Sequence, residues 1–232
     1  MTAALHMRWT DLAFLHWPVA YDAIRPMVPT AFELGTFDGA AWVGITPFRM
    51  TGVRPRFGPP VPTTNDFPEL NVRTYVRFRG RPGVYFFSLD AASRLAVVVA
   101  RVATNLPYRY ASMTQTRDGD DVVYTSSRRE SSAPSAEFRA RYRATGDVAL
   151  SAPGSFEYWA TERYSLFTIA GDSVLRLDIE HEPWPLQPAS VEIERNTMAR
   201  AAGIDLPDAP PRAHYSRSLD VVAHLPSRQR AR

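Results

Sequence analysis

Hydrophobic and polar residues alternate along the segment 69–76, and this alternation is the clearest structural signal in the chain. One set of positions holds Glu69, Asn71, Arg73 and Tyr75, and the other holds Leu70, Val72, Thr74 and Val76. A period of two is that of a β-strand, whose successive side chains point to opposite faces of a sheet. We therefore predict a strand here, paired as a hairpin with Val84–Leu89 around a turn at Arg81–Gly83.

Similar patterns predict the other elements. Strands are predicted at Ala40–Met50, Tyr108–Arg117, Asp121–Arg129, Phe138–Arg143 (an exposed strand), Ser173–Glu182 and His214–His224. Helices are predicted at Tyr21–Met27, at Ala91–Thr104, in the first half of Gly154–Ile169 with Ser155 as N-cap, and at Pro188–Gly203. The proline-rich segment Gly52–Pro68 is predicted to be a loop, and Pro226–Arg232 a frayed polar tail. We expect a single α+β domain over residues 1–225, with a mainly antiparallel sheet and short helices, followed by the tail 226–232.

Composition excludes several chemistries. All 27 basic residues are arginine, and the chain contains neither lysine nor cysteine. Schiff-base catalysis, covalently held pyridoxal phosphate and a phosphate-binding P-loop lysine each need a primary amine. Disulfides, thiolate nucleophiles and cysteine-ligated metals need a thiol. Any acid, base or nucleophile must therefore come from the histidines, carboxylates, tyrosines and hydroxyls.

The charge and hydropathy of the chain are those of an ordinary soluble protein. Hydrophobic residues make up 45% of the sequence, and the formal net charge is +3. The pI near 9.4 follows from arginines that stay protonated at high pH, so it is a weak indicator of nucleic-acid binding. The start of the chain lacks a signal-peptide hydrophobic region, and no apolar run approaches the roughly 20 residues of a membrane span. We expect a cytoplasmic protein that binds no membrane.

The polar face of the 69–75 strand has two interpretations. Charged residues on one strand face usually mark a solvated face, and the pattern alone favours that interpretation. Alternatively, the face lines a cavity, where the carboxylate of Glu69 and the guanidinium of Arg73 would fix a polar ligand. An arginine there would suit a carboxylate substrate, because its planar group binds carboxylates with two hydrogen bonds.

The remaining candidates carry weaker signals. His16 lies in an apolar run, where a hydrogen-bonded core histidine is the more common case. The histidines show no metal-ligand spacing, and neither the Gly-x-Ser-x-Gly nor the Gly-x-Gly-x-x-Gly motif occurs, so we expect no metal and no cofactor. The junction Arg101–Ala111 leads from a predicted helix into a strand through Pro107, which either ends the helix or holds Tyr108 and Arg109 at the mouth of a sheet.

Several segments together resemble one family. They are Phe14-Leu-His-Trp17, Glu69-Leu-Asn-Val-Arg-Thr-Tyr75, Gly83-Val-Tyr-Phe-Phe-Ser-Leu-Asp-Ala91, Arg101-x5-Pro107-Tyr108 and Glu162-Arg-Tyr164. Over about residues 7–225 the chain resembles the YqjF-like family of bacterial proteins, in the acetoacetate-decarboxylase-like superfamily. The resemblance implies a strongly bent, mainly antiparallel sheet that forms a cone or barrel around a cavity, with short helices outside. It also implies that the Glu69–Tyr75 face points into that cavity, and it is compatible with a homo-oligomer.

The resemblance gives the missing lysine a position. In the decarboxylases the helix-to-strand junction reads Arg-Glu-x-Trp-Gly-x-Pro-Lys-Lys, and one lysine forms the Schiff base. Arg101 and Pro107 keep that spacing, so Tyr108 and Arg109 stand where the two lysines would be. Imine-based decarboxylation is therefore excluded by chemistry. The resemblance also implies that Glu69 corresponds to the superfamily's active-site glutamate.

Three functional hypotheses follow. The first is a lyase or isomerase (dehydratase or cyclase included) without a Schiff base, acting on an oxo- or hydroxy-carboxylate or a polyketide-like carbonyl compound. Its catalytic residues would be Glu69, Tyr108 and Arg109, and its substrate-binding residues Arg73, Tyr75, Asn71 and His16. The second is a non-catalytic small-ligand-binding protein. The third, less favoured, is nucleic-acid or partner binding through the arginines at positions 77, 79 and 81.

Overall fold

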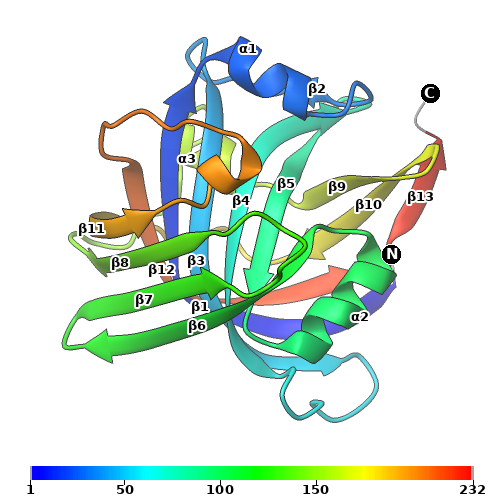
Figure 1. Ribbon diagram of the computed structural model, residues 1–232, viewed down its shortest axis with the longest axis horizontal. Coiled ribbons are helices and arrows are strands. Elements are labelled where there is room, and N and C mark those ends of the chain that lie inside the picture. Colours follow the sequence, from blue (N-terminus) through cyan, green and yellow to red (C-terminus); the bar gives the residue numbers. More distant parts are fainter. Residues whose placement is uncertain (1, 231–232) are drawn as a thin grey trace.

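The strands of the protein form one continuous, strongly bent sheet (Figure 1). The structure is a computed structural model and describes residues 2–230. Its strands are β1 Ala3–Val19, β2 Glu33–Leu34, β3 Ala41–Pro55, β4 Asp66–Phe78, β5 Arg81–Ala91, β6 Tyr108–Asp118, β7 Asp121–Arg128, β8 Glu137–Ala144, β9 Ser165–Ala170, β10 Ser173–Glu180, β11 Gln187–Asn196, β12 Arg212–His224 and β13 Ser227–Arg230. Its helices are α1 Tyr21–Ile24, α2 Arg94–Thr104 and α3 Phe156–Thr161, with 3₁₀ turns at Arg25–Met27 and Arg200–Ala202.

The sheet closes on itself. Strand pairing runs β4-β5-β6-β7-β8-β11-β12-β1-β3 and returns to β4, while β9 and β10 make a second connection from β5 to β12. The described strand pairs are antiparallel except β5–β6 and β5–β9, which are parallel. Closure of a bent sheet removes free edges and encloses an interior. The expected mainly antiparallel sheet around an interior, with short helices outside, is confirmed.

The β4–β5 hairpin forms as predicted, but its turn lies two residues earlier than expected. Arg79 and Gly80 have φ of 50° and 76°, which is the geometry of a two-residue hairpin turn between right-twisted strands. Gly83, expected in the turn, instead pairs with Val76 inside the hairpin. A Cβ atom there would lie 2.4 Å from the Ser165 carbonyl oxygen, so glycine is required for β9 to approach β5.

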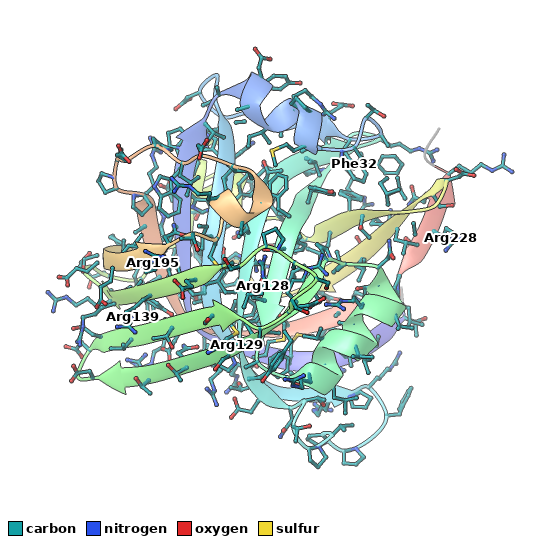
Figure 2. The ribbon with its side chains drawn as sticks, viewed as in Figure 1. Phe32, Arg128, Arg129, Arg139, Arg195 and Arg228 are labelled. Atoms are coloured by element: carbon teal, nitrogen blue, oxygen red, sulfur yellow. The ribbon has the colours of Figure 1, made fainter. Side chains whose placement is uncertain are left out.

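The predicted helix at Pro188–Gly203 is wrong. Most of this segment is β11, which pairs with β8, and only Arg200–Ala202 forms a 3₁₀ turn that Gly203 ends with φ of 82°. The period of two at Ala189, Val191 and Ile193, which pack against the main core, was the better signal. Strand β8 is exposed on one face only: Phe138, Ala140 and Tyr142 are buried, whereas Arg139 and its partner Arg195 on β11 are exposed (Figure 2).

The ends of the other irregular segments also differ from expectation. Ser227–Arg230, predicted to be frayed, forms β13 and pairs with β10; residues 231–232 lie outside the described residues. The loop predicted at Gly52–Pro68 is shorter, because β3 runs to Pro55 and β4 begins at Asp66. In contrast, the predicted N-cap is confirmed, since the Ser155 hydroxyl accepts a hydrogen bond from the Tyr158 backbone.

Helices α2 and α3 are the elements that bear on the site. Helix α2 lies at one end of the ring, next to the loop that joins β3 and β4 (Figure 1). Helix α3 packs elsewhere: the ring centre of Phe156 lies 4.2 Å from that of Trp42, and the ring centre of Trp159 lies 4.6 Å from that of Tyr75, both pairs in tilted geometry. Within residues 2–230, none of the helices combines the length and the apolar character that crossing a bilayer would require.

Candidate functional site

A cavity of about 420 Å³ lies within the sheet. Its lining comes from eight strands (β1, β3, β4, β5, β6, β9, β10 and β12), from α2, and from the chain around the ends of α3 and β10. Most lining residues are aliphatic or aromatic. Its polar members include Thr46, Glu69, Asn71, Arg73, Tyr108, Arg163 and His181. An apolar cavity with a few convergent polar groups is the usual form of a small-molecule site.

Strand β4 supplies the polar face that the sequence pattern identified. Glu69, Asn71 and Arg73 line the cavity, and the side chains of the alternate set, such as Leu70 and Val72, pack in the main core. Glu69 is 2% exposed and Asn71 is 5% exposed. The face is therefore enclosed and not solvated, which is the alternative that the pattern alone disfavoured.

Glu69 is buried with an incomplete set of partners. The Tyr108 phenol interacts with its carboxyl group, while Oε2 has no hydrogen-bond partner among the described residues. The pKa of Glu69 is raised to about 8, chiefly by burial; the Tyr108 hydrogen bond opposes the rise and the negative charge of Asp90 adds to it. Burial and the neighbouring Glu69 raise the pKa of Tyr108 well above its ordinary value. At neutral pH both groups are protonated, so the pair can donate protons inside the cavity.

Two arginines without a carboxylate partner lie in the same cavity. The guanidinium carbons of Arg73 and Arg163 lie 5.7 and 5.6 Å from the centre of the Tyr75 ring, so both cations contact one aromatic side chain. Within residues 2–230 neither forms an ion pair with a carboxylate, and Arg73 Nε is buried without a partner. Burial, together with the charges of Arg77 and Arg73, lowers the pKa of Arg163 to about 10. An anion bound here would offset the free-energy cost of keeping two buried arginines charged.

Sequence reasoning missed Arg163. Arg163 follows α3, whose C-cap is Glu162, and does not lie in a strand. The alternation of a strand therefore cannot predict where its side chain points. Its Nε donates to the Trp159 carbonyl oxygen, which fixes the side chain against the helix end. The available signal was the segment Glu162-Arg-Tyr164, which carried part of the family resemblance but received no role.

His16 and Tyr75 lie behind Arg73 and not in the cavity lining. His16 Nε2 and the Tyr75 hydroxyl share a hydrogen bond of 2.5 Å, and both residues are fully buried. Burial, followed by the nearby positive charge of Arg73, lowers the pKa of His16 well below its ordinary value, so the ring is neutral. A Cβ at Gly44 would lie 3.2 Å from the Tyr75 hydroxyl and 3.4 Å from Arg73 Cγ. The glycine therefore leaves room for this cluster to support Arg73.

The structure separates Tyr108 from Arg109. They are adjacent residues of β6, so they point to opposite faces, and only Tyr108 lines the cavity. Arg109 is partly exposed and pairs with Glu130 at 3.3 Å. Arg101 donates to the Tyr108 carbonyl oxygen at 2.9 and 2.6 Å and pairs with the same Glu130. The Arg101-to-Pro107 spacing thus fixes the start of β6, and through it the position of Tyr108.

Comparison with known proteins agrees with this architecture. The family DUF2071, described as an uncharacterized conserved protein, matches residues 6–220. The chain is 44% identical over 218 residues to the uncharacterized protein YqjF of Bacillus subtilis strain 168, covering 94% of this chain and 89% of that protein.

Solved structures with a similar fold have low sequence identity. The enduracididine biosynthesis enzyme MppR complexed with pyruvate matches with a TM-score of 0.65 at 13% identity, covering 100% of this chain and 91% of that one. An acetoacetate decarboxylase-like enzyme from Sphingomonas wittichii RW1 matches with a TM-score of 0.66 at 11% identity, covering 99% of this chain and 94% of that one. Acetoacetate decarboxylase from Legionella pneumophila matches with a TM-score of 0.65 at 13% identity, covering 98% of this chain and 88% of that one. At such identities the likeness shows the fold alone, and that fold is the one the resemblance implied.

Proposed function

The chain belongs to the DUF2071 family and has the acetoacetate-decarboxylase-like fold, and on this premise we propose that it is an enzyme of small carbonyl-containing carboxylates. The reaction class is that of a lyase or isomerase that works by acid–base chemistry, without a covalent intermediate. The observation that carries the proposal is a buried Glu69 with an unpartnered Oε2, in the same cavity as two arginines that lack a carboxylate partner among the described residues. Pyruvate bound to the similarly folded MppR supports an oxo acid as the ligand class.

Each group has a role that follows from its chemistry. Arg73 and Arg163 bind the substrate carboxylate, because a guanidinium offers paired N–H donors in one plane. Glu69 donates its proton to a carbonyl oxygen or a departing hydroxyl group, for which a pKa near neutrality is suited. Tyr108 then stabilises the resulting carboxylate through its hydroxyl, and the Asn71 amide orients the substrate. An imine with a lysine has no part in this scheme, because the chain contains no lysine.

The test is turnover of a panel of oxo and hydroxy acids by the wild-type protein and by Glu69→Gln. We expect Glu69→Gln to lose about 10²- to 10⁴-fold in turnover while it still binds the acid, since the amide preserves shape but cannot donate a carboxyl proton. Asp220→Asn is the matched control, because that carboxylate is exposed, pairs with Arg8, and is not part of the cavity lining. Full turnover by Glu69→Gln on an identified substrate would refute the assigned role.

Ligand binding without turnover is the second candidate. Among residues 2–230, Glu69 is the only carboxylate that lines the cavity, so a reaction that needs a second carboxylate as base would lack one. A binding protein would show a rise in Tm with the same acids in the wild type and in Glu69→Gln alike, and no product with either. Product formation by the wild type would remove this candidate.

A further inference from the structure

The cavity lining changes character along its length. Strand pairing places Arg73 beside Gly44, Asn71 beside Thr46, Glu69 beside Phe48 and Phe67 beside Met50. Strand β1 follows the same direction, with Phe14 near the Arg73 row, Trp9 paired with Met50, and Leu5 paired with Pro55. The rows therefore run from a cationic end at Arg73, past the proton donor Glu69, to an apolar end at Met50, Phe67 and Leu5.

The cationic end is closed and the apolar end is open. At the first, the ring of Tyr75 is fully buried under Trp159 of α3 and is flanked by both arginines. At the second, Leu5, Val61, Leu95 and Val99 line the cavity and are each more than a third exposed. They come from β1, the β3–β4 loop and α2, and the loop and helix lie next to each other in Figure 1. A ligand therefore enters past apolar side chains and reaches the arginines last.

The distance between the two ends exceeds the length of a three-carbon acid. Phe67 lies six positions before Arg73, which corresponds to about 20 Å along an extended strand. A pyruvate-sized molecule held by the arginines would not reach Met50, Phe67, Met7 or Val53, so the cavity surface that they line would have no contact with the ligand. Apolar surface left in water forgoes the free energy that burial supplies, and that gain accumulates with every added methylene.

We propose that the ligand is an amphipathic acid, whose carboxylate binds Arg73 and Arg163 and whose medium-length alkyl tail extends past Glu69 to the opening between α2 and the β3–β4 loop. This assignment of substrate class rests on the proposed function. It places the carbonyl or hydroxyl group that reacts near Glu69, between the carboxylate and the tail, and leaves the tail in the apolar rows. Arg54 and Thr64 provide polar contacts at the rim only.

Binding of straight-chain saturated monocarboxylates, from butanoate to dodecanoate, tests the tail separately from any reaction. Calorimetry on the full-length protein should show Kd falling about fourfold per added methylene until the tail reaches solvent. A Kd that stays constant with chain length would overturn the proposal. A Kd that rises with chain length would do so as well.

Two neighbouring valines on α2 provide a matched pair. Val98 and Val99 are 57% and 56% exposed, but only Val99 lines the cavity. Val99→Glu should weaken dodecanoate binding about tenfold and leave butanoate unchanged, because it places a charge against the tail and not against the carboxylate. Val98→Glu should change neither by more than about twofold. Equal effects of the two substitutions, or a loss of butanoate binding with Val99→Glu, would contradict the tail assignment.

These outcomes are independent of the proposed reaction. If Glu69→Gln retains full turnover, the catalytic role fails, and the chain-length series still reports on the tail because saturated acids are not transformed. If the series is flat while Glu69→Gln abolishes turnover, the enzyme stands and only the alkyl tail is refuted.

Discussion

Two buried carboxylates on neighbouring strands differ in how completely they are paired. Asp90 of β5 is fully buried and accepts two hydrogen bonds from Arg128, at 2.9 and 2.8 Å. The side chain of Arg128 is 4% exposed, and it lies near the middle of the view in Figure 2. Glu69 of β4 has the Tyr108 phenol on one side and an unpartnered oxygen on the other. Burial raises the pKa of both carboxyl groups, but only Asp90 has a guanidinium that offsets the shift.

The difference separates a structural group from a functional one. A buried ion pair with complete hydrogen bonding holds strands together, and its partners are satisfied within the protein. A buried carboxyl group with a free oxygen in a cavity has a hydrogen bond left for a ligand. The Arg128–Asp90 pair connects the end of β7 to β5, whereas Glu69, Arg73 and Arg163 can still bind a ligand in the cavity.

The largest expected effect is the loss of the complete pair. Asp90→Asn leaves the buried Arg128 guanidinium without its counter-charge and should lower the free energy of unfolding by about 3–5 kcal/mol. Glu69→Gln should not lower it at pH 7 and should raise it, because the amide is neutral in both states, whereas Glu69 must take up a proton to fold at this pH. Urea unfolding measures both. Equal losses would erase the distinction between the two sites, and Arg128→Met added to Asp90→Asn should restore part of the stability.

A second effect is a pH dependence of stability that belongs to Glu69. Its carboxyl group keeps its proton up to about pH 8 in the folded protein but releases it near pH 4.5 when unfolded. Between these values the folded state binds more protons, so its stability falls as pH rises, by up to about 1.4 kcal/mol per unit, and falls no further above pH 8. Unfolding curves of the wild type and of Glu69→Gln from pH 5 to 8.5 should differ by this slope. Parallel curves would contradict the raised pKa.

A smaller effect is expected from Tyr108→Phe. It removes the hydrogen bond that lowers the pKa of Glu69, so that pKa should rise above about 8 and any loss of activity at alkaline pH should move to higher pH. The loss of stability should be about 1 kcal/mol. Tyr110→Phe is the matched control, since Tyr110 lies on the same strand outside the cavity lining. An unchanged pH profile in Tyr108→Phe would contradict the proposed effect of the Tyr108 hydrogen bond on the pKa of Glu69.

The smallest effect is expected at Arg109. This side chain pairs with Glu130 at the surface of the sheet, so Arg109→Met should cost less than about 1 kcal/mol of stability and leave carboxylate binding unchanged. Arg73→Met, in contrast, should weaken carboxylate binding about tenfold or more. A binding loss with Arg109→Met comparable to that of Arg73→Met, measured by calorimetry with octanoate, would restore Arg109 to the site.

Sequence patterns predicted the strands that build the site better than the directions of its side chains. The alternation at 69–76 identified β4, and the residue types alone made Glu69 and Arg73 candidates. The pattern could not show whether the polar face of β4 is exposed to solvent or encloses a cavity, because enclosure depends on strands far away in the sequence, such as β1 and β10. It also could not show which of Tyr108 and Arg109 points into the cavity. The strand begins at Tyr108, so no alternation before it indicates the face to which each side chain points.

Non-periodic positions account for the other errors. Arg163 follows a short helix and reaches the cavity through tertiary packing against Trp159 and Tyr75, which local sequence does not encode. The helix expected at Pro188–Gly203 relied on a terminal glycine, although that glycine ends only a 3₁₀ turn after β11. The helix-ending signal of Gly203 was correct, but it applied to the last turn only and not to the whole segment.

The pKa of Glu69 tests the central claim most directly. The carboxyl carbon of Glu69, labelled with ¹³C and identified by its absence in Glu69→Gln, can be followed by NMR as the pH is raised from 4 to 9. The account predicts a titration near pH 8, with the group protonated at pH 7 in the ligand-free protein. A titration near 4.5 would mean that Glu69 is an ordinary ionised carboxylate, and it would remove the proton donor on which the proposed chemistry depends.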